Sequence, residues 1–510
     1  MSQLIATLER TVYVNEENGY TVAKVRLKGV RRSTITVVGI NLAAYPGETL
    51  ELEGEWEVDK KYGEQFRVHS FRSRAPASAQ AMEKYLASGL IKGIGPFLAK
   101  NLVQKFGVNT LQIIEQTPKK LLKVKGIGRV RTKLIHQAVM ENREIRELML
   151  FMQGHYLPAS LAVKAYKEYG QKALPVIKED PYRLADDIFG VGFKTADRVA
   201  LSLGLPTDSV SRAEAALVYI LGQLAGEGHV YCPQEELVAK VSELLEVDIS
   251  LPETAINLLA QPGRDKIVIE KLPSGERAVY RLPLYWAEVN VARRLLHLLH
   301  FPHLIKPPED LDGAIAEAEA GQGISFSATQ RQALTSMVSK KIVIITGGPG
   351  TGKTTLVKTF LAIAQKMGRL VLLAAPTGRA AKKLSETTGQ EAKTIHRLLE
   401  YAPVAGRFKR DERNLLRGDV ILVDEASMVD LVLMNNLIKA IPVHASLILV
   451  GDVDQLPSVG PGNVLRELIA SGQIPLVRLT EIFRQSKESL IVTNAHRINN
   501  GQLPWQPREQ

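Results

Sequence analysis

The spacing of apolar residues changes along the chain. Residues 1–75 alternate apolar and polar positions in short runs such as YTVAKVRL and LELEGEWEV, a pattern typical of half-buried β-strands. Residues 76–300 mostly show the spacing of amphipathic helices. After residue 323, short uninterrupted apolar runs alternate with helical segments, which indicates a parallel α/β sheet covered on both faces. The expected units are residues 1–75, 76–205, 206–300, a linker at 301–323, a main domain at 324–475, and the start of an incomplete further domain at 476–510.

The first 75 residues are expected to form a small β-barrel. Asn18-Gly19 separates two strand-like runs, which is a strong hairpin signal, and Pro46-Gly47 marks a second turn. Short strands at this spacing favour a barrel of the oligonucleotide-binding (OB) type, in which exposed aromatic side chains stack on bases. A structural cap or a docking module for a partner fits the same pattern.

Three glycine turns recur within residues 76–205, each between an apolar helix and a second helix, as in helix-hairpin-helix units. The turns are Gly93-Ile94-Gly95, Gly126-Ile127-Gly128 and Gly190-Val191-Gly192. Glycines at such a turn let the backbone approach a DNA phosphate, and the next helix offers free N–H groups. Lysines and arginines flank the first two turns, so Gly93, Gly95, Gly126 and Gly128 are predicted to bind DNA without sequence preference. A purely structural hairpin is the alternative, and it is favoured for the third turn, which Asp186 and Asp187 flank.

Residues 206–300 combine helical periodicity with a hairpin at KIVIEKLPSGERAVYRLP, which favours a winged-helix-like unit. Pro307-Pro308 and the glycines at 321 and 323 indicate a boundary before the main domain.

The stretch from Lys341 to Thr355, KIVIITGGPGTGKTT, is the most informative in the chain. It combines a buried strand, a glycine-rich turn matching G-x-x-x-x-G-K-[ST], and a helix start. Backbone N–H groups of such a loop surround phosphate oxygens, and the helix points its positive end at the same anion. Lys353 is expected to neutralise the β- and γ-phosphates of a nucleotide, and the Thr354 hydroxyl to hold Mg²⁺.

Four further strands are expected to start near Leu370, Val420, Leu447 and Leu476. Asp424 and Glu425 follow the second of these, at the strand end where parallel sheets bind ligands. Asp424 is expected to hold Mg²⁺, and Glu425 is the candidate general base for the attacking water. A solvated turn is the alternative.

Composition adds a preference for a polyanionic partner, because the formal net charge is +11 and the pI is about 9.4. The single cysteine, Cys232, excludes an intramolecular disulfide and a cysteine-based zinc site. The first residues lack the apolar core of a signal peptide, and no apolar run approaches membrane-spanning length, so a cytoplasmic protein without membrane contact is expected.

The motifs GGPGTGKTT, VDEASMVD and GDVDQLPSVGPGN resemble the first three motifs of superfamily 1 helicases, and APTGRAA, TIHRLL and LTEIFRQ resemble the RecD/TraA branch. With the β module and the glycine hairpins, the chain resembles long-form RecD-like helicases found outside the RecBCD complex. The resemblance implies a RecA-like motor that uses ATP and Mg²⁺ to move 5′ to 3′ on single-stranded DNA, with duplex/single-strand junctions as partners. It associates the chain with repair or recombination.

The resemblance also implies roles for particular residues. Gln330 would read the adenine edge, and the triphosphate would lie on Gly347, Gly348, Pro349, Gly350, Thr351, Gly352, Lys353, Thr354 and Thr355. Single-stranded DNA would contact Thr377, Gly378, Arg379, Thr394 and His396. Gln455 would sense the γ-phosphate, and Arg484 would reach it across the cleft. An ordinary surface charge for Arg379 and a helix-end salt bridge for Arg484 remain the alternatives.

The chain departs from this pattern because the last superfamily 1 motifs are not found before Gln510. A C-terminally truncated chain is therefore expected, one that binds ATP and DNA but hydrolyses ATP poorly and is defective in unwinding. The alternative function is a non-translocating DNA-binding module that uses ATP as a switch. An unrelated phosphate-loop enzyme, such as a clamp loader or a kinase, leaves APTGRAA and the spacing from Asp424 to Gln455 unexplained.

Overall fold

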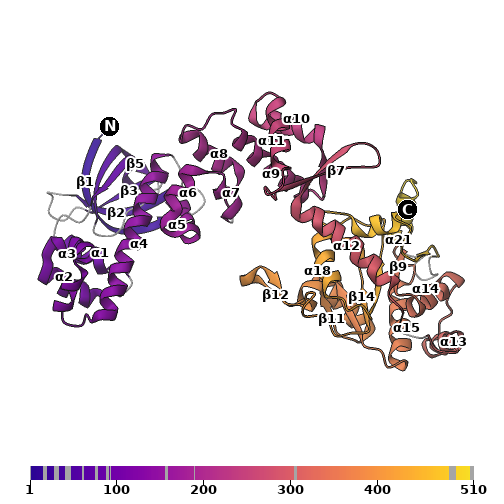
Figure 1. Cartoon of the computed structure of the whole chain (residues 1–510). Coiled ribbons are helices and arrows are strands. Elements are labelled where there is room, and N and C mark those ends of the chain that lie inside the picture. The colour runs from indigo at the N-terminus through magenta and orange to yellow at the C-terminus, as the bar shows by residue number, and fades with distance from the viewer. Residues whose placement is uncertain are drawn as a thin grey trace, which may run out of the picture. The chain divides into compact units, whose positions relative to one another are not determined.

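The computed structural model describes residues 2–14, 20–27, 34–40, 48–59, 63–74, 79–87, 91, 93–155, 159–188, 190–303, 307–481 and 490–505. The chain divides into two compact units, Met1–Arg212 and Ala213–Gln510. Each unit has its own arrangement of strands and helices (Figure 1). Every helix within the described residues is too short or too polar to span a lipid bilayer.

The first unit begins with the five-stranded closed barrel that the alternating pattern predicted. Its strands are β1 (Ser2–Val14), β2 (Tyr20–Leu27), β3 (Thr34–Ile40), β4 (Thr49–Asp59) and β5 (Gly63–Arg74), in the closed order β1-β2-β3-β5-β4. All neighbours are antiparallel except β3 and β5, which pair in parallel. Alternate residues such as Leu50, Leu52 and Phe66 fill the barrel interior and are almost fully buried. This is the strand order of an OB-like barrel.

Helices make up the rest of the first unit. They are α1 (Ala79–Ala87), α2 (Pro96–Phe106), α3 (Thr110–Gln116), α4 (Arg129–Gly154), α5 (Ala159–Tyr169), α6 (Ala173–Glu179), α7 (Arg183–Asp187) and α8 (Phe193–Ser202). The predicted glycine turns precede α2, α4 and α8. In each turn the middle residue donates its N–H to the residue three positions earlier: Ile94 to Ile91, Ile127 to Val124 and Val191 to Ile188, all at 3.1 Å. The first glycine of each turn has a positive φ, between 81° and 94°, which only glycine adopts without strain.

The second unit opens with a winged-helix-like arrangement. Helices α9 (Val210–Gly226), α10 (Gln234–Leu245) and α11 (Ser250–Leu259) surround a three-stranded antiparallel sheet in the order β6-β8-β7. Its strands are β6 (Tyr231–Pro233), β7 (Ile267–Lys271) and β8 (Arg277–Arg281), and β7 and β8 form the predicted hairpin. Helix α12 (Leu282–His300) follows directly after β8.

A six-stranded parallel sheet forms the centre of the second unit, in the order β11-β10-β14-β15-β9-β16. Its strands are β9 (Ile342–Gly347), β10 (Val371–Ala375), β11 (Ala392–Thr394), β14 (Val420–Val423), β15 (Ser446–Gly451) and β16 (Leu476–Leu479). Helices α13 (Leu311–Gln322), α14 (Ala328–Ser339) and α15 (Lys353–Lys366) supply most of the apolar core on one face, and α16 (Gly378–Thr388) adds Leu384. Helices α12, α17 (Ile395–Leu398), α18 (Leu431–Ala440) and α19 (Val464–Ala470) contribute to the core on the other face. Successive residues of β9 face opposite cores, so the strand needs an uninterrupted apolar run.

Three expected boundaries do not match this packing. Helix α12 lies within 206–300, yet its Val291 and Leu295 are buried in the core of the large sheet. Helix α13 lies within the expected linker, yet Ile315 is fully buried in the core on the opposite face. Strand β16 pairs in parallel with β9, so Leu476 extends the first sheet rather than starting another domain. In each case an apolar side chain is buried against residues distant in the sequence, and the local pattern does not identify them.

Candidate functional site

The glycine-rich loop after β9 turns directly into α15. Gly350 and Gly352 have φ values of 78° and 83°, so this part of the loop requires the left-handed conformation that glycine adopts freely. Gly352 is the N-cap of α15, and Lys353 is the first residue of the helix. The free N–H groups at this end of the helix therefore lie next to the loop, as phosphate binding requires.

Two glycines earlier in the loop are needed because there is no room for a side chain. A Cβ atom on Gly347 would lie 2.8 Å from Leu479 and from the Thr351 hydroxyl. A Cβ atom on Gly348 would lie 2.6 Å from the ring of His496, which belongs to α21 (Leu490–Asn499). The His496 Nε2 also lies 3.1 Å from the Pro349 carbonyl oxygen. His496 therefore lies against the loop, although the sequence analysis did not single it out.

Lys353 lies inside this loop, where its ammonium group donates to the carbonyl oxygens of Gly347 at 2.5 Å and Gly348 at 3.0 Å. Burial lowers the pKa of Lys353, whereas the nearby carboxylates of Asp452, Glu425 and Asp424 favour its charged form. A positive charge is thus held among three acidic side chains from the ends of two neighbouring strands.

Asp424 and Glu425 follow β14, at the same edge of the sheet. Burial and, to a smaller extent, the adjacent charge of Glu425 raise the pKa of Asp424, although the Glu425 N–H donates to its Oδ1 at 2.9 Å. Glu425 has a φ of 52°, a left-handed conformation that is uncommon for a non-glycine residue. Its Oε2 is buried and has no hydrogen-bond partner among the described residues. Backbone strain and an unpaired side-chain oxygen in one residue are typical of functional positions.

A cavity of about 670 Å³ opens beside these residues. It is lined by the loop and by residues from four other segments: Ile324, Ser325, Phe326, Gly348, Pro349, Gly350, Thr351, Gly352, Lys353, Thr354, Thr355, Lys383, Glu425 and Gln455. Backbone amides, a half-buried cation and a nearby carboxylate pair are the groups that a nucleotide triphosphate with a divalent cation needs. The residues present therefore fit that ligand, and Thr354 and Asp424 are the side chains suited to the metal.

Gln330 takes a different position from the expected one. It is only 2 % exposed and does not line the cavity. Its Oε1 accepts the Ser327 N–H in a capping box at the start of α14, and its Nε2 donates to the Thr351 carbonyl oxygen at 3.1 Å. Both ends of the amide are thus engaged, and in this geometry Gln330 supports the phosphate loop rather than presenting its amide to a base. The motif S-x-x-Q predicts such a capping box.

The loop after β15 reaches the cavity through Gln455. Asp452 is buried, and its carbonyl oxygen accepts the Gln455 N–H at 3.2 Å. The next acidic residue, Asp454, accepts a hydrogen bond from Asn499 of α21 at 2.8 Å. Arg484 lies outside the described residues.

The candidate DNA contacts lie at the carboxyl ends of β10 and β11, which are neighbours in the sheet. Thr377 caps α16 by accepting the Ala380 N–H at 3.2 Å, and Thr394 caps α17 by accepting the Arg397 N–H at 3.1 Å. Each hydroxyl oxygen therefore serves as an N-cap acceptor, and each hydroxyl still has a proton that it can donate. Gly378, Arg379 and His396 are exposed. Five residues named separately from the sequence thus gather along one edge.

Four family models match the chain in the order of its structural parts. An OB-fold domain of the ATP-dependent DNA helicase YrrC matches residues 1–76, and a SAM-like helix-hairpin-helix tandem matches 84–139. The helix-hairpin-helix domain of the ATP-dependent RecD2 DNA helicase matches 141–231, and an AAA domain matches 330–461. Together with the phosphate loop and the parallel sheet, these matches define a phosphate-loop motor of the DNA helicase class.

Comparison with individual proteins shows to which family of DNA helicases the chain belongs. The chain is 32 % identical to the ATP-dependent RecD2 DNA helicase of Deinococcus radiodurans over 97 % of its own length and 69 % of that protein. It is 44 % identical to the RecBCD enzyme subunit RecD of Mycobacterium tuberculosis over 28 % of each chain. It is 40 % identical to the ATP-dependent DNA helicase dda of phage T4 over 24 % of its own length and 30 % of that protein. The chain belongs to the RecD2 family of ATP-dependent DNA helicases.

Proposed function

We propose that this chain hydrolyses ATP with Mg²⁺ and couples hydrolysis to 5′-to-3′ movement along single-stranded DNA. The observation that carries the proposal is the meeting of Lys353 with Asp424, Glu425 and Asp452 at the edge of the cavity. A half-buried lysine among carboxylates from two strands is the arrangement that a triphosphate with its metal completes.

The roles of the side chains follow from their positions. Lys353, now bonded to two carbonyl oxygens of its own loop, would turn to the β- and γ-phosphates when a nucleotide binds. Thr354 and Asp424 would hold Mg²⁺, which neutralises charge that develops on the phosphates. Glu425, with one unpaired oxygen, would accept a proton from the attacking water. Gln455 would contact the γ-phosphate from the loop after β15.

Single-stranded DNA would lie along the ends of β10 and β11. The exposed backbone of Gly378 permits close approach of a phosphate, while Thr377 and Thr394 can donate their hydroxyl protons to phosphate oxygens. Because Thr377 and Asp424 follow the paired strands β10 and β14, DNA and nucleotide would bind to adjacent parts of one sheet edge.

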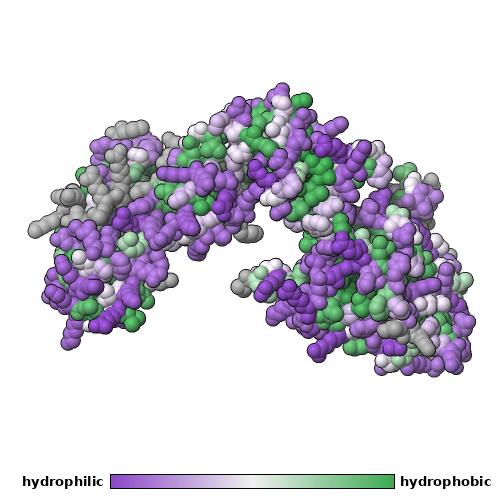
Figure 2. Space-filling view, in the orientation of Figure 1, coloured by the Kyte–Doolittle hydropathy of each residue, from purple (hydrophilic) through white to green (hydrophobic). Residues whose placement is uncertain are grey.

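The first two glycine hairpins would bind the duplex side of a junction. Residues 93–140 contain nine lysines and arginines but one glutamate, so this small region has a net charge of +8, against +11 for the whole chain. The lysines and arginines of this region are exposed, as are Gly126 and Gly128 of the second turn. Figure 2 shows the surface here as largely hydrophilic with a few hydrophobic residues, and Phe97 and Val130 are 78 % and 82 % exposed at equivalent positions after the two turns. Such a surface suits contacts to phosphates and sugars that are independent of sequence.

The third hairpin would be structural. Asp197 of α8 forms a buried ion pair with Arg212 at 2.9 Å and accepts a hydrogen bond from the Tyr182 hydroxyl at 2.9 Å. Asp187 pairs with Arg183 at 3.0 Å. Acidic groups near the turn are thus occupied in holding helices together, and they would repel a phosphate.

Unwinding of tailed duplexes tests the proposal. With Mg²⁺ and ATP, a duplex with a 5′ single-stranded tail is expected to be separated, and one with a 3′ tail is expected to stay paired. The poor hydrolysis and defective unwinding expected from the sequence stay a prediction, which the rate of this separation tests. DNA binding that responds to ATP without separation of either substrate would favour the alternative, a non-translocating module with an ATP-dependent switch. Separation of the 3′-tailed duplex alone would contradict the proposed polarity.

A further inference from the structure

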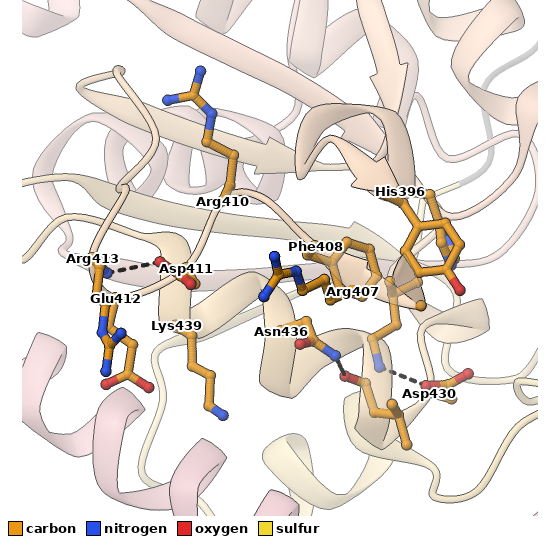
Figure 3. A pocket seen from close by; sticks show the side chains of 14 residues that line it. His396, Arg407, Phe408, Arg410, Asp411, Glu412, Arg413, Asp430, Asn436 and Lys439 are labelled. Carbon is orange, nitrogen blue, oxygen red and sulfur yellow. Dashed lines mark hydrogen bonds between the residues drawn. The ribbon is translucent and has the colours of Figure 1, made fainter. Parts of the chain in front are cut away.

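A second, larger cavity of about 810 Å³ lies away from the phosphate loop. It is enclosed by α18 and by the segment between α17 and β14, which includes the short strands β12 (Tyr401–Ala402) and β13 (Arg407–Phe408). The residues that the argument uses are His396, Tyr401, Arg407, Phe408, Arg413 and Lys439, and Figure 3 shows this cavity from close by.

Three aromatic rings meet on one side of the cavity. The ring centroids of Tyr401 and Phe408 are 5.0 Å apart, and His396 lies 5.7 Å from Tyr401 and 5.6 Å from Phe408. Phe408 is half-buried against the core beside the large sheet, whereas Tyr401 is 41 % exposed. The cluster therefore has a fixed base and an open aromatic surface. Every nucleobase has flat faces that stack on such a surface.

The charged residues of the cavity differ in whether they already form hydrogen bonds or ion pairs. Asp411 accepts the backbone N–H groups of Arg413 and Asn414, and Asp430 accepts the Leu433 N–H at 2.7 Å. Glu412 pairs with Arg294 of α12 at 2.6 Å. All three acids of the lining thus have partners.

Most of the cationic side chains that line the cavity have no acidic partner. Arg410 pairs with Glu400 at 2.6 Å, but the side chains of Arg407, Arg413 and Lys439 have no acidic partner among residues 307–481 and 490–505. The unpaired charge that remains in the cavity is therefore positive, next to an aromatic surface. Together these two features suit a nucleotide, which has an anionic phosphate and a flat base.

The position of the cavity identifies the strand that would supply this nucleotide. His396 belongs both to the cavity and to α17, whose N-cap Thr394 ends β11. A strand bound at Thr377 and Thr394 therefore reaches the cavity without leaving the surface of the second unit. We propose that this cavity binds one unstacked nucleotide of the bound single strand, with its base against Tyr401 and its phosphate against Arg407 and Lys439. This assignment rests on the proposed function, because it requires single-stranded DNA at the ends of β10 and β11.

Duplex DNA suits this cavity less well. In a duplex both faces of each base are stacked on neighbours, so Tyr401 would find no free base face. The pairing of Glu412 with Arg294 also ties the outer segment to α12, so that the aromatic and basic walls are held in place. The cavity is thus expected to distinguish unpaired from paired nucleotides.

Photochemical crosslinking of the whole chain tests the proposal directly. The probe is an oligothymidylate that carries 5-iodouracil at single positions, because this base crosslinks to aromatic side chains on which it stacks. Mass spectrometry of the digested complex is expected to locate a crosslink within residues 396–408. Tyr401→Ala should reduce that crosslink about tenfold, the size of one lost stacking contact, and Tyr401→Phe, the matched control, should retain it. Because Tyr401 is partly exposed, its truncation leaves the core intact, which a thermal unfolding curve checks.

The outcomes separate this proposal from the function on which it rests. If DNA stimulates ATP hydrolysis but crosslinks are found only outside residues 396–408, or if Tyr401→Ala crosslinks as well as the unmodified chain, the cavity assignment is wrong and the helicase function stands. If single-stranded DNA neither crosslinks to the chain nor changes ATP hydrolysis, the proposed function itself fails, and the cavity assignment fails with it. Arg407→Ala together with Lys439→Ala should weaken crosslinking in low salt more than in high salt.

Discussion

Two regions of this chain use a glycine turn before a helix, and they surround it with opposite chemistry. In the phosphate loop, Lys353 is half-buried, donates hydrogen bonds to the loop backbone and lies near three carboxylates. In the first two hairpins, the turn at Gly126 and Gly128 is exposed, and so are the lysines and arginines around it, although Arg131 donates to the Gly126 carbonyl oxygen at 2.8 Å. The backbone device is similar, since both turns need glycine with a positive φ and both place helix N–H groups at the surface of a ligand.

The difference indicates what each region binds. A half-buried cation in a cavity suits one small ligand, because its charge is less screened than that of an exposed cation and the cavity sets the geometry of binding. Exposed cations on a surface suit a long polyanion, because binding then depends on counterion release rather than on one geometry. The third hairpin separates the two factors, since it keeps the turn and lacks the surplus of positive charge. The backbone turn alone is thus insufficient to predict DNA binding.

The largest effect is expected from Lys353→Ala. Loss of the only lysine at the start of α15 should reduce ATP hydrolysis at least about 100-fold, because charge on the γ-phosphate is no longer neutralised in the transition state. DNA binding by the hairpins should be unchanged. Lys358→Ala is the matched control, since Lys358 is exposed on the same helix and should leave hydrolysis as it is. Normal hydrolysis in Lys353→Ala would remove the basis for the nucleotide site.

The next effect concerns the charge around the second hairpin. Replacing Lys123, Lys125, Arg129 and Arg131 by glutamine should weaken duplex binding strongly and lower the slope of log affinity against log salt by about 3 to 4. Fluorescence anisotropy at several salt concentrations measures both quantities. Replacing Lys194 and Arg198 near the third turn is the control and should change neither. Equal losses from the two sets would contradict the distinction between the hairpins.

A smaller effect is expected from a single methyl group. A Cβ atom on Gly128 would meet nothing within 4 Å, and its φ is not positive, so Gly128→Ala should fold normally. The methyl group should nevertheless keep a phosphate from the backbone and weaken duplex binding about fivefold, or ~1 kcal/mol. Gly192→Ala at the equivalent position of the third turn should have no such effect. A Gly128→Ala protein with unchanged unfolding temperature and unchanged affinity would show that phosphates do not approach this turn.

Lys341 is a buried cation that lies outside both proposed anion-binding regions, so its charge is expected to destabilise the fold. It is 6 % exposed, its ammonium group has no hydrogen-bond partner within the described residues, and it lies 5.3 Å from the centre of the Phe301 ring. Burial lowers the pKa of Lys341 from 10.5 to about 8, so at pH 7 the folded protein holds a charge that burial disfavours. Lys341→Met should therefore raise the free energy of unfolding at pH 7 by about 1–3 kcal/mol.

The pH dependence of that gain has a definite sign. Between pH 8 and 10.5 the unfolded chain binds the Lys341 proton more tightly than the folded one, so the unmodified protein gains stability as pH rises. The advantage of Lys341→Met should shrink over the same interval, as urea unfolding at pH 7, 8.5 and 10 can measure. A constant advantage would mean that the charge of Lys341 is not its cause.

Much of this architecture could be predicted from local pattern. The strands β9, β10, β14 and β15 each contain a continuous apolar run, and the turns at Gly93, Gly126 and Gly190 have a fixed three-residue form. Strand β11, with the sequence AKT, has no apolar run and was not predicted. Its position is set by pairing with β10, which is a tertiary contact.

The residues of the candidate site also fall into two groups: those predictable from local motifs and those placed by tertiary contacts. Lys353 and Thr354 were predicted from the loop motif, and Asp424 from its place directly after a buried strand. Gln330 was expected at a base, but the capping box at Ser327 and the carbonyl of Thr351 occupy its amide. His496 lies more than 140 positions from Pro349 in sequence, and only the fold brings its ring to the loop. A residue whose role depends on a neighbour distant in the sequence is not found by searching for motifs.

A binding titration tests whether a nucleotide site and a DNA site lie on one edge of the sheet and influence each other. A fluorescent ATP analogue with Mg²⁺ is titrated into the whole chain, with and without saturating single-stranded oligothymidylate. We expect that the analogue binds and that DNA changes its affinity, with the reciprocal change in DNA affinity when the analogue is saturating. No binding of the analogue, or an affinity that is identical with and without DNA, would contradict it.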